Sequence, residues 1–190
     1  MRTPALRPME FAGAWYPGTA KACAAQIEGW WAGLPADEGR RSDAPAATTR
    51  LGVVPHAGWV YSGRLAARVF HALGPDPDVQ LALVLGGHLR TTDPVVAMGA
   101  GAWETPFGPV PMHTGFAPVL DALERDGALR LRRETPERYT ADNSTELQLP
   151  FVRHAFPNAE ALVMRVPPSS AALALGAALA DYLALAGARS

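Results

Sequence analysis

The chain has 190 residues, which predicts a single domain with a sizeable core, because domains most often contain about 100–150 residues. Its 48% hydrophobic and 18% charged residues are typical of a globular protein and exclude disordered and collagen-like chains. The net charge of −1 argues against nucleic acid and anionic membranes as partners, since clustered basic residues bind both. A single cysteine, Cys23, and the lack of an apolar leader or a long apolar stretch predict a cytoplasmic protein.

The first 50 residues predict an arm, a helix and a polar segment, in that order. Residues 1–18 contain many Pro and Gly residues and are expected to be extended, with aromatic anchors at Phe11, Trp15 and Tyr16. Apolar residues then recur at helical spacing and predict an amphipathic helix over 19–34, with Cys23 buried on its apolar face. Residues 35–50 are expected to be a polar linker or surface loop without catalytic groups.

A βαβ unit is predicted by the next three segments. Residues 51–54 form a short apolar run, residues 63–73 have helical spacing, and residues 81–85 form a continuous apolar run. A continuous run of this kind is typical of a strand that is buried on both faces. The crossover of such a unit is right-handed in nearly all cases and lays its two parallel strands side by side or nearly so.

The remainder of the chain predicts further strands and helices. Residues 95–98 and 110–112 flank a Gly- and Pro-rich turn, which indicates a hairpin or an excursion at a sheet edge. The other expected elements are a helix over 118–125, a polar strand over 130–133, a helix over 143–156 interrupted at Pro150, a buried strand over 161–166 and a final helix to residue 185. Together they predict a three-layer α/β fold with a mostly parallel or mixed sheet and helices on both faces.

Two histidines directly follow the two predicted strands of the βαβ unit. His56 stands in Pro-His-Ala-Gly and His88 in Gly-Gly-His. Ligands of parallel sheets bind outside the carboxyl ends of the strands, so both imidazoles are expected at one crevice. They could share one metal ion with bonds of about 2.0–2.1 Å, and Gly58, Gly86 and Gly87 would leave room for a ligand. The alternative is that each histidine only hydrogen-bonds a loop carbonyl.

The third group of the site is harder to identify from the sequence. Asn143-Ser-Thr-Glu146 has the form of a capping box, with Asn143 as N-cap and Glu146 reaching back to its N–H. Glu146 is also a candidate general base, or the carboxylate that completes a two-His-one-carboxylate set for Fe(II). His113 is a further candidate ligand, whereas His71 and His154 lie within predicted helices and are expected to be structural.

Hydroxyl groups near His56 are weaker candidates. Tyr61 lies five residues past His56, where its phenol could reach the site, although a packing role is equally expected. Ser62 is a weak nucleophile candidate because no third group that would orient a base is evident. The chain contains no G-x-S-x-G elbow, P-loop, dinucleotide fingerprint or C-x-x-C motif.

Several segments taken together resemble the Memo family, also called AmmeMemoRadiSam system protein B. They occur in the family's order over nearly the whole chain. The segments are Phe-Ala-Gly-Ala-Trp-Tyr-Pro-Gly18, Val-Val-Pro-His-Ala-Gly-Trp-Val-Tyr-Ser-Gly63, Leu-Val-Leu-Gly-Gly-His88, Trp-Glu-Thr-Pro-Phe-Gly108 and Ser-Thr-Glu-Leu-Gln-Leu-Pro-Phe151. The resemblance implies the α/β fold of the class III extradiol dioxygenases, which use non-haem iron.

The resemblance also implies a metal site. This chain differs from the family's pattern at two places. The family binds its metal with two histidines, which match His56 and His88, and with a cysteine near the C-terminal end. The family's histidine before the Ser-x-Glu motif corresponds to Asn143, which removes a proton carrier. Family members continue past the equivalent of the final helix to the cysteine, so we expect this chain to be a C-terminally short member. Cys23 lies in the wrong part of the fold to replace that ligand.

Three functions follow as hypotheses. The first is a metal-dependent oxidoreductase or dioxygenase-like enzyme for a small, for example phenolic, substrate, with Fe(II) expected first and Zn or Cu as alternatives. Here Glu146 or a partner chain completes the site and Tyr61 hydrogen-bonds substrate. The second is a catalytically reduced binding or assembly subunit, in a homo-oligomer or with another chain covering its open edge. The third is a hydrolase with a metal-bound water as nucleophile.

Overall fold

A four-stranded mixed sheet forms the centre of the molecule. The structure, a computed structural model, describes residues 5–34 and 50–187. The sheet has the order β2 (Leu81–Gly86), β7 (Glu160–Arg165), β3 (Val95–Met98) and β6 (Leu131–Glu134). β2 pairs with β7 and β3 with β6 in parallel, whereas β3 and β7 are antiparallel. The sheet is therefore mixed, as expected.

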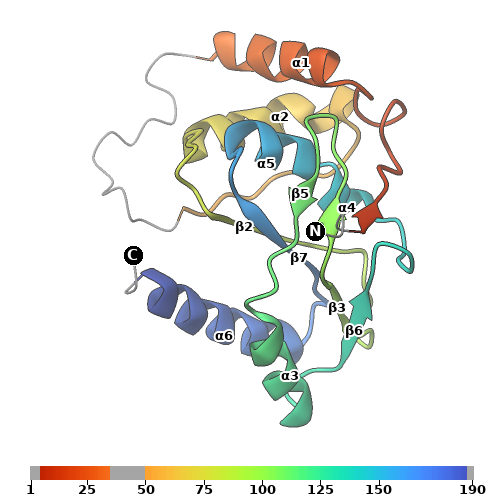
Figure 1. The fold of residues 1–190 in the computed structure, drawn as a ribbon, viewed down its shortest axis with the longest axis vertical. Helices are drawn as coiled ribbons and strands as arrows, with labels where there is room; N and C mark the ends of the chain where they lie inside the picture. Colours follow the sequence, from red (N-terminus) through yellow and green to blue (C-terminus); the bar gives the residue numbers. More distant parts are fainter. Residues whose placement is uncertain (1–4, 35–49, 188–190) are drawn as a thin grey trace.

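Helices cover both faces of this sheet (Figure 1). On one face lie α1 (Ala20–Ala32), α2 (Trp59–Leu73) and α5 (Leu149–Ala155), and on the other lie α3 (Ala117–Arg125) and α6 (Ser170–Gly187). Side chains alternate along a strand, so Val163 packs into the first apolar cluster while Leu162 and Met164 pack into the second. The three-layer α/β prediction is confirmed.

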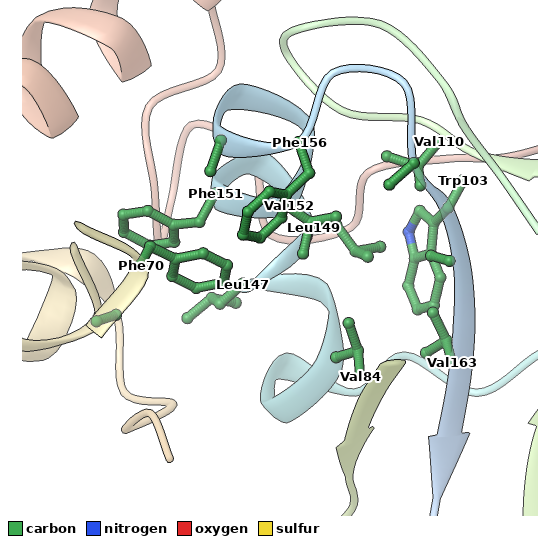
Figure 2. Close-up of a cluster of buried hydrophobic side chains, with 14 of the residues drawn as sticks. Phe70, Val84, Trp103, Val110, Leu147, Leu149, Phe151, Val152, Phe156 and Val163 are labelled. Carbon is green, nitrogen blue, oxygen red and sulfur yellow. The ribbon is translucent and has the colours of Figure 1, made fainter. Parts of the chain in front are cut away.

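Aromatic side chains dominate the core between the sheet and the first group of helices. Phe151 stacks on Phe70 with 5.1 Å between ring centroids, and its ring lies 4.3 Å from that of Trp59. In Figure 2, Val163 of β7 lies close to Trp103, across the same cluster from Phe70 and Phe151. Full burial of one such side chain stabilises the fold by about 1.5–3 kcal/mol, so this cluster fixes α2 and α5 on the sheet.

The predicted hairpin has different partners from those expected. β5 (Val110–Pro111) pairs with β4 (Ala102–Trp103), and β4 pairs in parallel with β1 (Leu6–Arg7) to form a second, three-stranded sheet. Residues 95–98 do not pair with 110–112, because β3 has β7 and β6 as neighbours. All four residues of β3 are buried, which is typical of an inner strand and not of a hairpin at an edge.

The predicted strand over 51–54 is not formed, so the βαβ unit was wrong in its first element. This segment runs along α2, where the Arg50 side chain donates hydrogen bonds to the carbonyls of Leu73 and Gly74. Leu51 and Val53 are 91% and 88% exposed. Within the described residues no strand pairs with this segment, and β2 is consequently an edge strand.

The remaining expectations agree with the structure within small shifts. The helix predicted over 143–156 is divided into α4 (Asn143–Glu146) and α5, with Pro150 in the first turn of α5. The polar segment 35–50 lies outside the described residues except for Arg50. Among the helices that the structure describes, none is long and apolar enough to cross a lipid bilayer.

A buried ionic cluster joins the two sheets. Glu134 at the end of β6 accepts a hydrogen bond of 3.1 Å from Arg7 of β1 and another from Arg165 of β7. The three side chains are almost fully buried. The Arg7 guanidinium also stacks on Trp103, 3.5 Å from the ring centroid. Burial lowers the pKa of Arg7 and Glu134 opposes this effect, so the carboxylate compensates for charge that water cannot reach.

We expect Glu134→Gln to destabilise the protein by about 3–5 kcal/mol, because it removes the counter-charge of the buried Arg7 guanidinium and one of the two carboxylates beside Arg165. Urea unfolding followed by fluorescence measures this loss. Glu28→Gln is the matched control, since Glu28 is exposed and its contact with His154 is 3.9 Å long. The control should change stability by less than about 1 kcal/mol. Equal losses in the two variants would contradict a structural role for the cluster.

Candidate functional site

His56 and His88 lie side by side on the surface. Their ring centroids are 4.9 Å apart and the ring planes are nearly perpendicular, at 88°. His88 follows the end of β2, and His56 lies in the irregular segment before α2, which begins at Trp59. Both side chains are exposed. The structure thus brings together the two predicted residues, although His56 does not follow a strand.

Asn143 lies between the two histidine segments and bonds to both. Its side-chain nitrogen Nδ2 donates to the backbone carbonyl of His56 at 2.8 Å. Its Oδ1 lies 3.1 Å from Nε2 of His88. One side chain therefore holds the backbone of one histidine and the ring of the other.

The turn at the start of α4 also holds the loop that carries His88. Ser144 Oγ accepts a 2.7 Å hydrogen bond from the N–H of Gly87 and donates to Asp142. Gly87 has φ +116°, a region that other residues rarely adopt, and a Cβ there would lie 2.7 Å from Cβ of Arg165. The glycine is thus required by close packing against Arg165.

The predicted capping box was wrong in its N-cap. Asp142 caps α4 by accepting from the N–H of Ser144, because the side chain of Asn143 is used by the histidine segments. Asp142 and Ser144 were not among the predicted site residues. The Asp-x-Ser pattern at a helix start was the available signal.

Glu146 is fully buried and binds the N-terminal arm. Its Oε1 accepts hydrogen bonds from the N–H of Phe11 at 2.8 Å and from the hydroxyl of Tyr16 at 3.0 Å. Its Oε2 has no hydrogen-bond partner among the described residues. Burial raises the pKa of Glu146, and the bonds from Phe11 and Tyr16 only partly oppose that effect. This carboxyl group anchors the arm and does not reach back to the N–H of Asn143.

The two hydroxyl candidates lie in the first turn of α2. Tyr61 is 84% exposed, so its phenol faces solvent. Ser62 is buried and its hydroxyl donates to the carbonyl of Ala57 at 2.9 Å. Ser62 thus supports the turn after His56, and within the described residues no hydrogen bond or ring contact joins Tyr61 to either histidine.

The other histidines and the cysteine have partners elsewhere. His113 Nδ1 contacts Glu160 and its Nε2 contacts the hydroxyl of Tyr182, both at 2.7 Å, so neither nitrogen is free for a metal. The rings of His71 and His154 pack against Trp31. Cys23 is buried, donates to the carbonyl of Pro17, and has its pKa raised to about 11 by burial.

A complete metal site is not formed by the residues that the structure describes. In residues 5–34 and 50–187, no three His, Cys, Asp or Glu side chains are grouped closely enough to hold an ion. The two exposed imidazoles can supply two nitrogen ligands, a donor type that suits Zn, Cu and Fe. The described residues therefore supply no third ligand of these four types beside the two histidines.

The wild-type protein should lose stability relative to Glu146→Gln as the pH rises above about 4.5, the ordinary glutamate pKa. A carboxyl group whose pKa is raised in the folded state binds more protons there than in the unfolded state, so its contribution falls with rising pH. Urea unfolding of both proteins between about pH 4 and pH 8 measures the difference. A difference that does not change with pH would contradict this assignment.

Comparison with known proteins identifies the family of the chain and agrees with the fold. The family model described as Memo-like protein matches residues 7–185. A MEMO1 family protein of Pyrobaculum aerophilum is 33% identical over 136 residues, which cover 70% of this chain and 46% of the relative. A MEMO1 family protein of Ignicoccus hospitalis is 28% identical over 174 residues, covering 88% of this chain and 59% of the relative.

The match is long in this chain and partial in the relatives. A MEMO1 family protein of Caldivirga maquilingensis is 34% identical over 106 residues, and these are only 36% of its length. The chain thus spans about a third to three fifths of the relatives that it matches. Since the family model covers almost all of the chain, the protein belongs to the Memo-like family, which has an extradiol dioxygenase-like fold.

Proposed function

We propose that the protein binds a divalent transition metal through His56 and His88 and acts as a non-haem metal-dependent oxidoreductase on a small molecule. The observation that carries the proposal is the pair of adjacent, exposed imidazoles, 4.9 Å apart. This spacing is compatible with both rings reaching one ion, because metal–imidazole bonds measure about 2.0–2.1 Å. Fe(II) is the ion we propose first, with Zn or Cu as alternatives.

The metal would supply Lewis acidity and, as Fe(II), redox chemistry, while the chain's own residues orient its ligands and the substrate. Asn143 holds the His88 ring and the His56 backbone, so the two donors keep their relative position. Tyr61 has an exposed phenol that is available to hydrogen-bond a polar substrate. We assign Glu146 the role of anchoring the arm, because its carboxyl group is buried and bonded to Phe11 and Tyr16.

Metal binding should disappear in the double variant His56→Ala/His88→Ala, because both proposed ligands are lost. The protein is purified without oxygen, loaded with Fe(II), desalted and measured by elemental analysis. His113→Gln is the control, since His113 lies elsewhere in the fold and is engaged by Glu160 and Tyr182. We expect the wild type and the control to retain metal. A wild type that retains none, or a double variant that retains as much, would overturn the proposal.

Oxygen consumption with catechol-like compounds separates the two enzyme classes. The oxidoreductase predicts O₂ uptake that requires metal, His56 and His88. A metal-dependent hydrolase, in which a metal-bound water is the nucleophile, predicts bound metal without O₂ uptake and cleavage of activated esters. The first result supports the proposed function and the second replaces it.

A specific observation favours a second candidate function, a subunit that works only when a second copy of this chain covers its open face. Exposed large apolar side chains come from the segment before His56, from α2 and from β2, the strand that precedes His88: Leu51, Val53, Val60, Tyr61, Leu65 and Leu85. The last of these lies on β2, an edge strand of continuous apolar sequence. Such an edge tends to pair with another strand.

We commit to a second copy as the occupant because a twofold-symmetric interface uses the same patch on both subunits, so the edge of β2 and the exposed apolar side chains of α2 can supply both sides. In this arrangement the second copy covers β2 and brings further side chains toward His56 and His88.

Light scattering of the purified protein should show a dimer, and Val60→Glu/Leu65→Glu should convert it to a monomer, because two charges cannot be buried in an apolar interface without partners. Leu173→Glu is the control, since Leu173 is 79% exposed on α6, on the other face of the sheet. It should leave the dimer intact. A monomeric wild type would exclude a second copy as the occupant.

A further inference from the structure

The two hydrogen bonds of Asn143 determine where the proton of His88 lies. The carbonyl of His56 can only accept a hydrogen bond, so the amide nitrogen of Asn143 has to face it, at 2.8 Å. This orientation leaves Oδ1 facing Nε2 of His88, at 3.1 Å. An amide oxygen also can only accept, so Nε2 of His88 has to carry a hydrogen.

A neutral imidazole has one N–H and one nitrogen with a free lone pair. We infer that Asn143 is a positioning residue that holds His88 as the Nε2–H tautomer and thereby leaves Nδ1, on a ring whose centroid lies 4.9 Å from that of His56, as the donor atom of the site. The assignment of Nδ1 as a metal ligand rests on the proposed function. The tautomer itself does not, because it follows from the hydrogen bonds of the metal-free protein.

The surroundings of Asn143 prevent its amide from turning over. Turning it would place Oδ1 against the His56 carbonyl, two acceptors facing each other, so that hydrogen bond would be lost, and the bond to His88 would be kept only if its proton moved to Nδ1. An unsatisfied buried group costs about 1–3 kcal/mol, and somewhat less where water reaches the group, as it does here. The original orientation is therefore the stable one.

The backbone on both sides of Asn143 is held by contacts of its two neighbours, Asp142 and Ser144. Asp142 caps α4 and lies 3.9 Å from the guanidinium of Arg165. Ser144 bonds to the N–H of Gly87, the residue before His88. Asp142 and Ser144 are both buried. The same turn thus fixes the amide and the loop that carries the ring, so the direction of Nδ1 is set before any ligand binds.

Partners that orient a metal-bound histidine usually affect metal affinity by about 10–100-fold when they are removed. Asn143 has this position relative to His88, and it additionally fixes the backbone of His56. Its loss should therefore weaken metal binding without removing either ligand.

The tautomer is tested by ¹⁵N-resolved NMR of the imidazole groups in metal-free protein at about pH 8, where an ordinary histidine is neutral. We expect Nε2 of His88 to be protonated and Nδ1 to have a free lone pair. Titration with Zn²⁺ should then shift Nδ1 while Nε2 keeps its proton. A proton on Nδ1, or a zinc-dependent shift at Nε2 instead, would overturn the inference.

Variants test whether Asn143 causes the tautomer. Asn143→Ala should give a mixture of both tautomers and weaken Zn²⁺ binding by about 10–100-fold, whereas Asn143→Asp retains an acceptor and should keep the Nε2–H form. Asn158→Ala is the control, because Asn158 is an exposed asparagine that donates to the carbonyl of Pro77. It should change neither quantity.

The outcomes also separate this inference from the proposed function. An unchanged tautomer in Asn143→Ala would overturn the role of Asn143 even if metal still binds. A wild type that binds no metal would overturn the proposed function and the role of Nδ1 as a ligand, while the tautomer is still measured in the free protein. If Asn143→Ala does not fold, as judged by its amide spectrum, Asn143→Asp and the wild type still decide the position of the proton.

Discussion

The hydrogen bonds of the short helix α4 and its cap hold the candidate site together. Asp142 approaches Arg165 of the central sheet, Asn143 bonds to both histidine segments, and Ser144 bonds to the loop before His88. Glu146 at the other end binds the N-terminal arm. The histidine pair, the sheet and the arm are therefore all bonded to the same five residues, 142–146. The positions of the two rings depend on these residues because each ring lies on an irregular segment.

Buried charged side chains limit the positions that residues 142–146 can take. Arg165 contacts Glu134, which also binds Arg7 of the second sheet. Charges removed from water are stable only in close, well-oriented pairs, so these side chains permit few alternative positions. The backbone of Arg165 in turn packs against Gly87. The ionic cluster thus links the second sheet to the loop that carries His88, without touching either histidine.

The polar groups of the region divide into an exposed set and a buried set. His56 and His88 face solvent and are accessible to a metal ion or a small molecule. Glu134 and Glu146 are buried and are already bonded within the protein. Glu134 and Glu146 therefore serve as partners of other buried groups, whereas the two histidines remain accessible. This division supports a site in which the chain supplies two ligands.

Local patterns in the sequence were sufficient for the three-layer fold and for most helices, and they predicted the proximity of His56 and His88, although the strand expected before His56 is not formed. Apolar periodicity shows which face of a helix or strand is buried, and residues at the start and end of each element limit its length. The family could also be identified, because its motifs are short and contiguous. The strand expected over 51–54 is not formed and Leu51 and Val53 are exposed, because an apolar run does not show whether a neighbouring strand or helix is present to cover it.

Only the tertiary structure decided the partners of the polar side chains. The bond from Phe11 to Glu146 spans 135 residues, and the bond from Asn143 to His56 spans 87. The sequence predicted a capping box in which Asn143 is the N-cap and Glu146 bonds to its N–H. In the structure both side chains form these long-range hydrogen bonds instead. The sequence by itself determined which residues are available for chemistry, because residue type and periodicity are local properties. The fold decided which of them are occupied, because a hydrogen bond depends on distances that only the packed chain sets.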